Sequence, residues 1–162
     1  MPRLVFPTPL GSCALSWHEH GLTRFELPEA APQANDVSAA PEPIAQLIAR
    51  VRDHLAGRFQ DFADVIFDFK TVPEFNAEVL RATLQVKSGT TRTYGEIARL
   101  IGRGPVASRA VGAALGENPW PLLIPCHRIV AADGKMTGFS GPGGIRTKLR
   151  LLALEGAELF AD

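Results

Sequence analysis

Residues 94–116 read YGEIARLIGRGPVASRAVGAALG, and this stretch decides the fold of the second half of the chain. Its first part repeats apolar residues at helical spacing, namely Tyr94, Ile97, Ala98 and Ile101. A second helical segment runs from Val106 to Leu115 and stops at Gly116. The GRGP sequence between them has the composition of a tight turn. Two short helices joined in this way predict a helix-turn-helix.

The second of these helices carries little side-chain bulk around Arg109. The small residues on it include Ala107, Ser108, Ala110 and Gly112. A helix this bare can press its backbone against a neighbouring helix, or into a nucleic-acid groove narrower than the major groove. A helix-turn-helix transcription factor would more usually carry polar, base-reading side chains here, so this sequence does not favour one.

The first half of the chain has the pattern of a small sheet with one covering helix. Residues 4–6, 13–17 and 22–27 predict strands, with turns at residues 8–11 and 20–21. Apolar spacing from Pro43 to Leu55, with a stop at Gly57, predicts an amphipathic helix. The intervening segment, residues 28–43, contains four prolines and predicts a loop.

The segment between the two halves predicts one more strand and one more helix. Residues 65–69 (VIFDF) have strand composition. A helix is expected from Pro73, with Phe75, Val79, Ala82 and Val86 on one face. The expected fold is α+β, with an N-terminal domain at residues 1–74 in which an antiparallel sheet packs against a helix. A mainly helical C-terminal domain with the helix-turn-helix would occupy residues 75–162.

Bulk composition narrows the class of protein. The chain has 162 residues and no apolar run long enough to span a membrane, so we expect a soluble, cytoplasmic protein. We also expect it to be a monomer. The zero net charge hides a segregation of charges. Residues 1–84 hold 7 Lys and Arg against 11 Asp and Glu, whereas residues 85–156 hold 10 against 4. This segregation is compatible with a protein whose basic second half binds nucleic acid and whose acidic first half does not.

Residues 118–130 read NPWPLLIPCHRIV and carry the chemistry of the sequence. A thiol, an imidazole and a guanidinium follow one another at Cys126, His127 and Arg128. A cysteine becomes a nucleophile when a neighbouring base or positive charge favours its thiolate, and both are adjacent here. An isolated Cys-His pair would more often lie unreactive in a packed core. The prediction of a reactive cysteine therefore depends on the whole segment 118–130 and not on the pair alone.

The segment 124–130 (IPCHRIV) resembles the active-site signature of the O6-alkylguanine-DNA alkyltransferases, also called methylated-DNA–protein cysteine methyltransferases. Five further segments resemble family motifs in family order: residues 93–98 (TYGEIA), 108–112 (SRAVG), 118–119 (NP), 135–139 (KMTGF) and 151–156 (LLALEG). The resemblance is strong from residue 75 to 156 and looser over residues 1–74.

The resemblance implies irreversible, single-turnover DNA repair, in which Cys126 takes the alkyl or methyl group of an O6-alkylguanine. His127 would accept the thiol proton, and Glu155 would orient the imidazole. Tyr94 would donate to the departing guanine, and Lys148 would support the leaving oxygen and the tyrosine. No metal or other cofactor is required by this scheme.

The resemblance also implies a partner, double-stranded DNA containing O6-alkylguanine, bound through its minor groove with the damaged base flipped out. Arg109 would fill the space that the base leaves. The other DNA-contacting residues would be Thr93, Ala107, Ser108, Ala110, Gly112 and Arg128. Asn118 would bridge the recognition helix and the active-site turn. Trp120, Pro121, Phe139 and Ser140 would lie around the alkyl pocket, with packing the better expectation for Trp120.

Three further features set the limits of the resemblance. The loop at residues 138–145 is longer than the family's usual form and carries Phe139 where a tyrosine is common, which bears on the range of alkyl groups accepted. An alkyltransferase-like protein that flags damage without repairing it is the alternative function, but such proteins lack the cysteine that Cys126 supplies. No zinc site is expected from Cys13, His18, His20 and His54, because the spacing matches no ligand pattern and Cys13 would face away from His18 and His20 on a strand.

Overall fold

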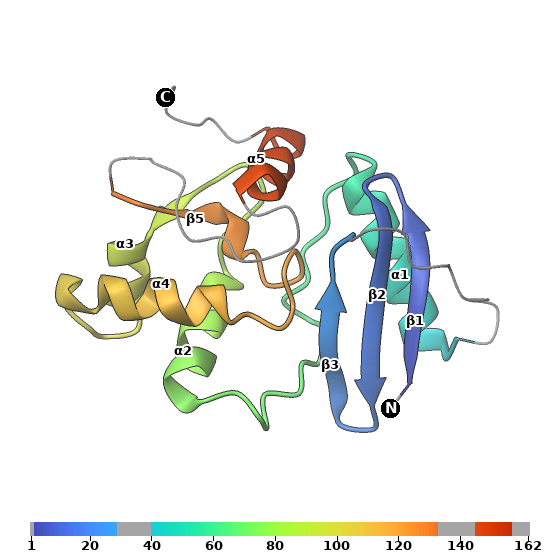
Figure 1. Ribbon diagram of the computed structural model, residues 1–162, viewed down its shortest axis with the longest axis horizontal. Coiled ribbons are helices and arrows are strands. Elements are labelled where there is room, and N and C mark those ends of the chain that lie inside the picture. Colours follow the sequence, from blue (N-terminus) through green and yellow to red (C-terminus); the bar gives the residue numbers. More distant parts are fainter. Residues whose placement is uncertain (1, 29–39, 133–144, 157–162) are drawn as a thin grey trace.

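The computed structural model describes residues 2–28, 40–132 and 145–156. A sheet with one helix and a helical part lie side by side, as Figure 1 shows. This is the α+β arrangement that the sequence predicted, and it is confirmed by the match to solved structures reported below. Within the described ranges, no helix is long and apolar enough to cross a membrane.

The sheet consists of β1 (Arg3–Thr8), β2 (Gly11–His18) and β3 (Gly21–Glu26), which pair antiparallel in that order. The β2–β3 turn requires a glycine at Gly21. Its φ is +127°, and a Cβ there would lie 2.7 Å from the backbone oxygen of Ile66. Because Gly21 has no side chain, the backbone at Ile66 can pass directly beside the turn.

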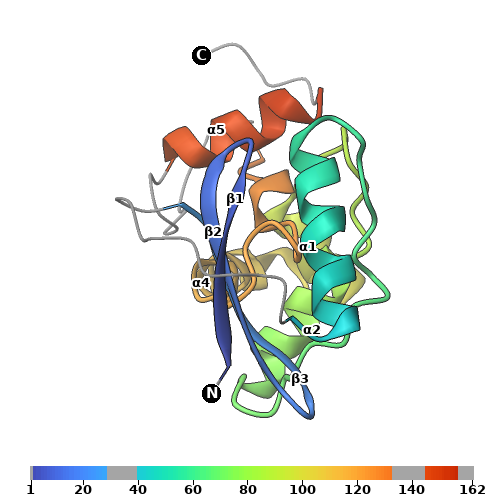
Figure 2. The ribbon, with the colours of Figure 1, turned by 90° about the vertical axis from the view of Figure 1, so that its right-hand side faces the viewer.

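Helix α1 (Glu42–Leu55) covers one face of this sheet, which Figure 2 shows from the side. Pro43 lies in its first turn, where the missing N–H costs nothing. Its buried face consists of Ile44, Leu47, Ile48, Val51, His54 and Leu55. Arg52 fastens the helix to β1 by donating from Nε to the backbone oxygen of Pro7 at 2.9 Å.

The strand expected at residues 65–69 is reduced to a single bridge. Phe67 pairs with Leu22 on the open edge of β3, through hydrogen bonds from Leu22 N to Ile66 O and from Asp68 N to Leu22 O, each 2.9 Å long. The chain then leaves the sheet, because the ring of Phe69 packs against Trp120 of the other half, with ring centroids 5.2 Å apart. Apolar composition predicted a strand, but packing against the helical part ends the pairing after one residue.

The helical part follows in sequence. Its elements are α2 (Glu74–Thr83), β4 (Arg92–Thr93), α3 (Tyr94–Leu100), the 3-10 turn η2 (Pro105–Ala107), α4 (Ser108–Gly116), the 3-10 turn η3 (Cys126–Arg128), β5 (Ile129–Val130) and α5 (Ile145–Leu154). The predicted helix-turn-helix is α3, η2 and α4. Helix α2 ends earlier than expected, so Val86 is buried beyond its end instead of on its face.

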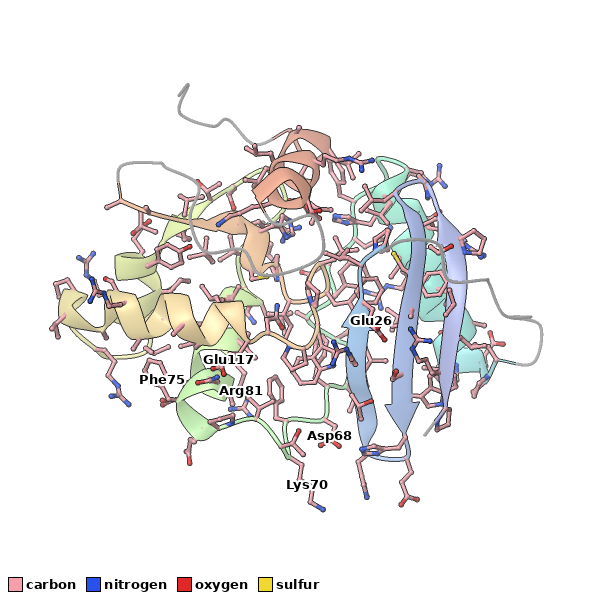
Figure 3. The ribbon with its side chains drawn as sticks, viewed as in Figure 1. Glu26, Asp68, Lys70, Phe75, Arg81 and Glu117 are labelled. Carbon is pink, nitrogen blue, oxygen red and sulfur yellow. The ribbon has the colours of Figure 1, made fainter. Side chains whose placement is uncertain are left out.

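The two halves share one continuous apolar core. At its centre Trp120 is fully buried, and its Nε1 donates to the backbone oxygen of Leu22 at 3.1 Å. In Figure 3, Arg81 of α2 lies near the connecting segment that carries Asp68 and Lys70, where the two halves meet. Its guanidinium carbon lies 4.6 Å from the ring centroid of Phe69. The two halves are packed on each other through this shared core. The predicted division into domains at residues 1–74 and 75–162 stays a prediction.

Candidate active site

The loop between α4 and η3 is held together by Asn118. Its Oδ1 accepts from the backbone N of Trp120, and its Nδ2 donates to the backbone oxygen of Ile124, both at 2.9 Å. Within this loop Leu122 is buried with a φ of 76°, a conformation that is costly for a residue with a Cβ. The Asn118 hydrogen bonds hold the strained loop closed, and the loop places Cys126 at the first position of η3.

Cys126 is buried, and its surroundings favour the neutral thiol in the resting protein. Burial raises the pKa of Cys126 above its ordinary value of 9.0. A hydrogen bond with Asn118 and the charge of Lys148 oppose this shift but do not overcome it. The thiol must therefore lose its proton during a reaction.

Glu155 directly follows α5, and each oxygen of its carboxylate has two side-chain partners. Its Oε1 accepts from Arg128 Nε at 2.8 Å and pairs with His127 Nε2 at 3.1 Å. Its Oε2 accepts from Arg128 Nη2 at 2.7 Å and pairs with His54 Nε2 at 2.8 Å. Burial opposes ionisation of Glu155, but the hydrogen bonds from Arg128, His127 and His54 outweigh it and hold the pKa of Glu155 far below its ordinary value.

The ionised Glu155 fixes the tautomer of His127. A carboxylate can only accept, so His127 Nε2 carries the proton and Nδ1 bears a lone pair. Burial lowers the pKa of His127, although Glu155 pulls it upward, so the ring is neutral. Among the described residues, His127 Nδ1 is the one buried side-chain nitrogen or oxygen that has no hydrogen-bond partner. The adjacent residue in the chain is Cys126.

Lys148 and Tyr94 lie on another side of the site. Lys148 is buried on α5 and donates from Nζ to the backbone oxygen of Ile129 at 2.7 Å. The same Nζ lies 5.9 Å from the ring centroid of Tyr94, at the start of α3. Burial lowers the pKa of Lys148 to about 8, and the interaction with Cys126 opposes that shift.

The helix-turn-helix positions the predicted DNA-contacting residues at its surface. Thr93 caps α3 in a reciprocal capping box with Glu96. Arg109 and Ala110 on α4 are exposed, whereas Ala107, Ser108 and Gly112 are half-buried. Ser108 Oγ donates to Pro105 O at 2.7 Å, which holds the turn before α4. Gly112 faces the ring of Tyr94, because a Cβ there would lie 3.8 Å from the ring.

Arg128, which was predicted to contact DNA, lies inside the protein. Its side chain is buried, and besides Glu155 it binds the backbone oxygen of Val86 and Ser88 Oγ. These contacts use four of the five N–H groups of the guanidinium inside the protein. Arg128 thus supports the carboxylate of Glu155, and its predicted contact with DNA stays a prediction.

Trp120 follows the packing expectation, because its ring lies in the shared core against Phe67 and Phe69. Pro121 is half-buried beside it in the same loop. Phe139 and Ser140, and residues 138–144 of the long loop, lie outside the described residues. Their predicted place at the alkyl pocket stays a prediction.

His54 is the site residue that sequence reasoning missed. It was weighed only as a zinc ligand, yet its ring lies against Glu155, a residue 101 positions away in the chain. The sequence signal was weak, since His54 occupies the apolar face of an amphipathic helix where an aliphatic residue is usual. Cys13 lies elsewhere in the first half, where burial raises its pKa to about 11.

Comparison with known proteins identifies the same family throughout the chain. The family model described as 6-O-methylguanine DNA methyltransferase, DNA binding domain, matches residues 74–157. The methylated-DNA–protein-cysteine methyltransferase of Mycobacterium bovis is 37% identical over 157 residues, which cover 96% of this chain and 92% of that protein. The crystal structure of Mycobacterium tuberculosis OGT in complex with DNA superimposes with a TM-score of 0.78 at 35% identity, covering 94% of this chain and 92% of that one. A DNA base-flipping protein of Thermus thermophilus is 37% identical over 155 residues, covering 93% of this chain and 97% of that protein.

The family model that covers the helix-turn-helix describes a DNA-binding domain, and the next segment of the same half carries a buried thiol beside a histidine that Glu155 holds. The chain belongs to the O6-methylguanine DNA methyltransferase family. Its activity is that of a methylated-DNA–protein-cysteine methyltransferase, which acts in DNA repair. The resemblance seen in the sequence is thereby confirmed.

Proposed function

We propose that Cys126 is the residue that accepts the alkyl group. The observation that carries this proposal is the lone pair on His127 Nδ1, which is buried, has no protein partner among the described residues and belongs to the residue next to Cys126. Because Glu155 holds the proton on Nε2, Nδ1 is the nitrogen that can receive the thiol proton, directly or through one water. The resting thiol then becomes a thiolate only when a substrate is in place.

The reaction exchanges two bonds. Cys126 Sγ forms a bond to the alkyl carbon while the bond from that carbon to guanine O6 breaks. Tyr94 supplies a proton to the departing guanine, so the base leaves neutral. The thiol proton is then on His127, and once His127 releases it to water and Tyr94 takes a proton from water, no net proton is gained or lost. Lys148 supports the leaving oxygen and the tyrosine, in agreement with its place between the ring of Tyr94 and Ile129 O.

The product is a thioether, which has no good leaving group at the alkyl carbon, so the protein acts once. The scheme uses no metal and no cofactor.

We also propose that the DNA partner is a duplex with O6-alkylguanine, bound through the minor groove by one copy of the chain. The alkyl carbon lies inside a base stack, so the nucleotide must be flipped out. The exposed Arg109 stands on the bare surface of α4, where it can fill the vacated space. Because the substrate is DNA, we retain the prediction that the protein works in the cytoplasm, on the nucleoid.

The alternative is a protein that flips or flags damaged bases without transfer, and one relative is named a DNA base-flipping protein. The presence of Cys126, with a histidine and a carboxylate arranged to deprotonate it, favours transfer. A protein that only binds damage needs neither a thiol nor a base beside it.

Mass spectrometry after incubation with an O6-methylguanine duplex tests the proposal. We expect a gain of one methyl group per protein molecule, with a plateau when the lesion is in excess, and peptide mapping should place the methyl group on Cys126. Cys13 should stay unmodified, because its raised pKa keeps it a thiol and the side-chain partner of its sulfur among the described residues is the hydroxyl of Thr8, not a base. Cys126→Ser should bind the lesion without transfer. Turnover beyond one equivalent, label on Cys13 or transfer by the serine variant would contradict the mechanism.

A further inference from the structure

Helix α1 of the first half reaches the active-site carboxylate. In Figures 1 and 2 the end of α1 lies beside the end of α5, although the two helices are far apart in sequence. At that point His54 Nε2 lies 2.8 Å from Glu155 Oε2, and both side chains are fully buried. The first half thus supplies a polar side chain to the cluster that surrounds His127.

The tautomer of His54 is fixed from its other side. The backbone N–H of Gln60 donates to His54 Nδ1 at 3.0 Å, so Nδ1 is an acceptor and Nε2 carries the proton. The ring is also held between Phe59 and Phe62, whose centroids lie 5.4 Å and 5.7 Å from its own. His54 therefore presents a rigid N–H donor to Glu155 Oε2.

We propose that His54 is a positioning residue for alkyl transfer, which holds Glu155 so that its other oxygen faces His127. The inference rests on the roles proposed above for His127 and Glu155. Arg128 binds both oxygens from one side, and His54 binds Oε2 from the α1 side. With donors on both sides, the carboxylate cannot turn away from His127.

His54 also affects where the proton rests during the reaction. When His127 accepts the thiol proton, its Nε2 proton is drawn toward Glu155. Each further donor on Glu155 lowers the basicity of the carboxylate, so the proton stays on His127. In the described part of the chain, the charged or titratable groups around His54 Nε2 are Glu155, which directly follows α5, and His127 and Arg128 of η3. His54 accordingly restrains the pull that Glu155 exerts on His127.

Two substitutions separate the donor from the bulk of the side chain. His54→Leu introduces an apolar side chain of similar size and removes the donor. His54→Gln places an amide N–H2 near the position of Nε2 and should restore it. The matched control is Lys87→Met, which removes another contact between the two halves, the exposed ion pair between Lys87 Nζ and Asp61 Oδ2, without touching Glu155.

The test is single-turnover transfer from free O6-methylguanine base, measured against pH for each folded variant, so that DNA binding does not enter. We expect His54→Leu to react about tenfold more slowly at neutral pH, the effect of losing one buried hydrogen bond to a charged group. On the acid side of its pH profile, the rate of His54→Leu should begin to fall at a higher pH than in the wild type. The reason is that a more basic Glu155 raises the pKa of His127 and leaves less neutral imidazole. His54→Gln should recover most of the rate and of the pH profile, and Lys87→Met should match the wild type.

A purely structural role would give His54→Leu the same fractional loss at every pH, and that result would overturn the proposal. So would a wild-type profile in His54→Leu, or a glutamine variant no better than the leucine variant. Glu155→Gln distinguishes a failure of the role of His54 from a failure of the roles of Glu155 and His127. If it reacts normally, the roles proposed for Glu155 and His127 fail; if it is slow while His54→Leu is normal, only the role of His54 fails.

If the leucine variant does not fold, nitrogen-15 NMR of the histidines in the wild-type protein decides. His54 should show a protonated Nε2 and an unprotonated Nδ1 at neutral pH, and the reverse tautomer would overturn the inference.

Discussion

His127 and Glu155 share a buried hydrogen bond of 3.1 Å between Nε2 and Oε1. The partner that fixes this ring is ionised, since three side chains donate to the same carboxylate. The contact decides which nitrogen of His127 is free to accept a proton, and it makes Glu155 the residue whose change should have the widest effects.

Glu155→Gln should slow alkyl transfer on the order of a hundredfold at neutral pH, within the range that a positioned general base contributes. The amide stabilises the imidazolium of His127 less than the carboxylate does, so the apparent pKa of the Cys126 thiol should rise further. Titration of thiol reactivity against pH measures both effects. The exposed Glu117, which accepts from Asn76, gives a matched control in Glu117→Gln. An unchanged titration curve in Glu155→Gln would remove Glu155 from the site.

The same cluster predicts how stability depends on acid. The folded pKa of His127 is depressed below its ordinary 6.5, so the unfolded chain takes up a proton that the folded chain does not as the pH falls. The folded pKa of Glu155 is also depressed below its ordinary 4.5, so the stability it confers is present above that value and is lost below it. We expect the free energy of unfolding, measured in urea, to fall from neutral pH downward and to fall more steeply below about pH 4.5.

Glu155→Gln checks this assignment, because it leaves the buried Arg128 without its counter-charge. At neutral pH the variant should lose about 3–5 kcal/mol of the free energy of unfolding, as expected when one partner of a buried ion pair is removed. The difference from the wild type should shrink in acid. A difference that stays constant with pH would show that Glu155 is not the ionised group.

Lys148 should impose an alkaline limit on the reaction. Because burial lowers its pKa to about 8, its charge, which we propose supports the leaving oxygen, is present below that pH and is lost above it. The rate of alkyl transfer should therefore fall as the pH rises past about 8. The pKa of Cys126 is raised above 9.0, so thiol ionisation does not mask the fall. Lys148→Gln should be slower at neutral pH and should lack this alkaline limb; a limb that persists in the variant would assign it to another group.

Arg109→Ala should weaken repair of duplex DNA far more than reaction with a free O6-alkylguanine base, because the role proposed for the exposed arginine is base extrusion and not displacement. Single-turnover rates on the two substrates make the comparison. Arg24→Ala removes an exposed arginine from β3 and should leave both rates unchanged. Equal losses on both substrates in Arg109→Ala would count against the proposed role.

Much of the fold followed from local patterns along the chain. The three strands, helix α1 and the helix-turn-helix were predicted, because alternation, helical spacing and turn residues act within a few positions. The predictions failed where a distant contact took over. Residues 65–69 form one bridge instead of a strand because Phe69 packs on Trp120. Helix α2 ends at Thr83, and Val86 is buried beyond it.

The candidate site divides in the same way. The sequence by itself identified the Cys126–His127 pair and the helix of small residues around Arg109, because each of these features consists of residues that are neighbours in the chain. It pointed to Glu155 through family resemblance. Only the tertiary structure decided that Arg128 points inward to Glu155 and that His54 meets the same carboxylate from the first half of the chain. The reason is physical: a buried carboxylate must be satisfied by whichever donors the packed core brings to it, and side-chain donors far apart in the sequence meet only when the two halves are folded against each other.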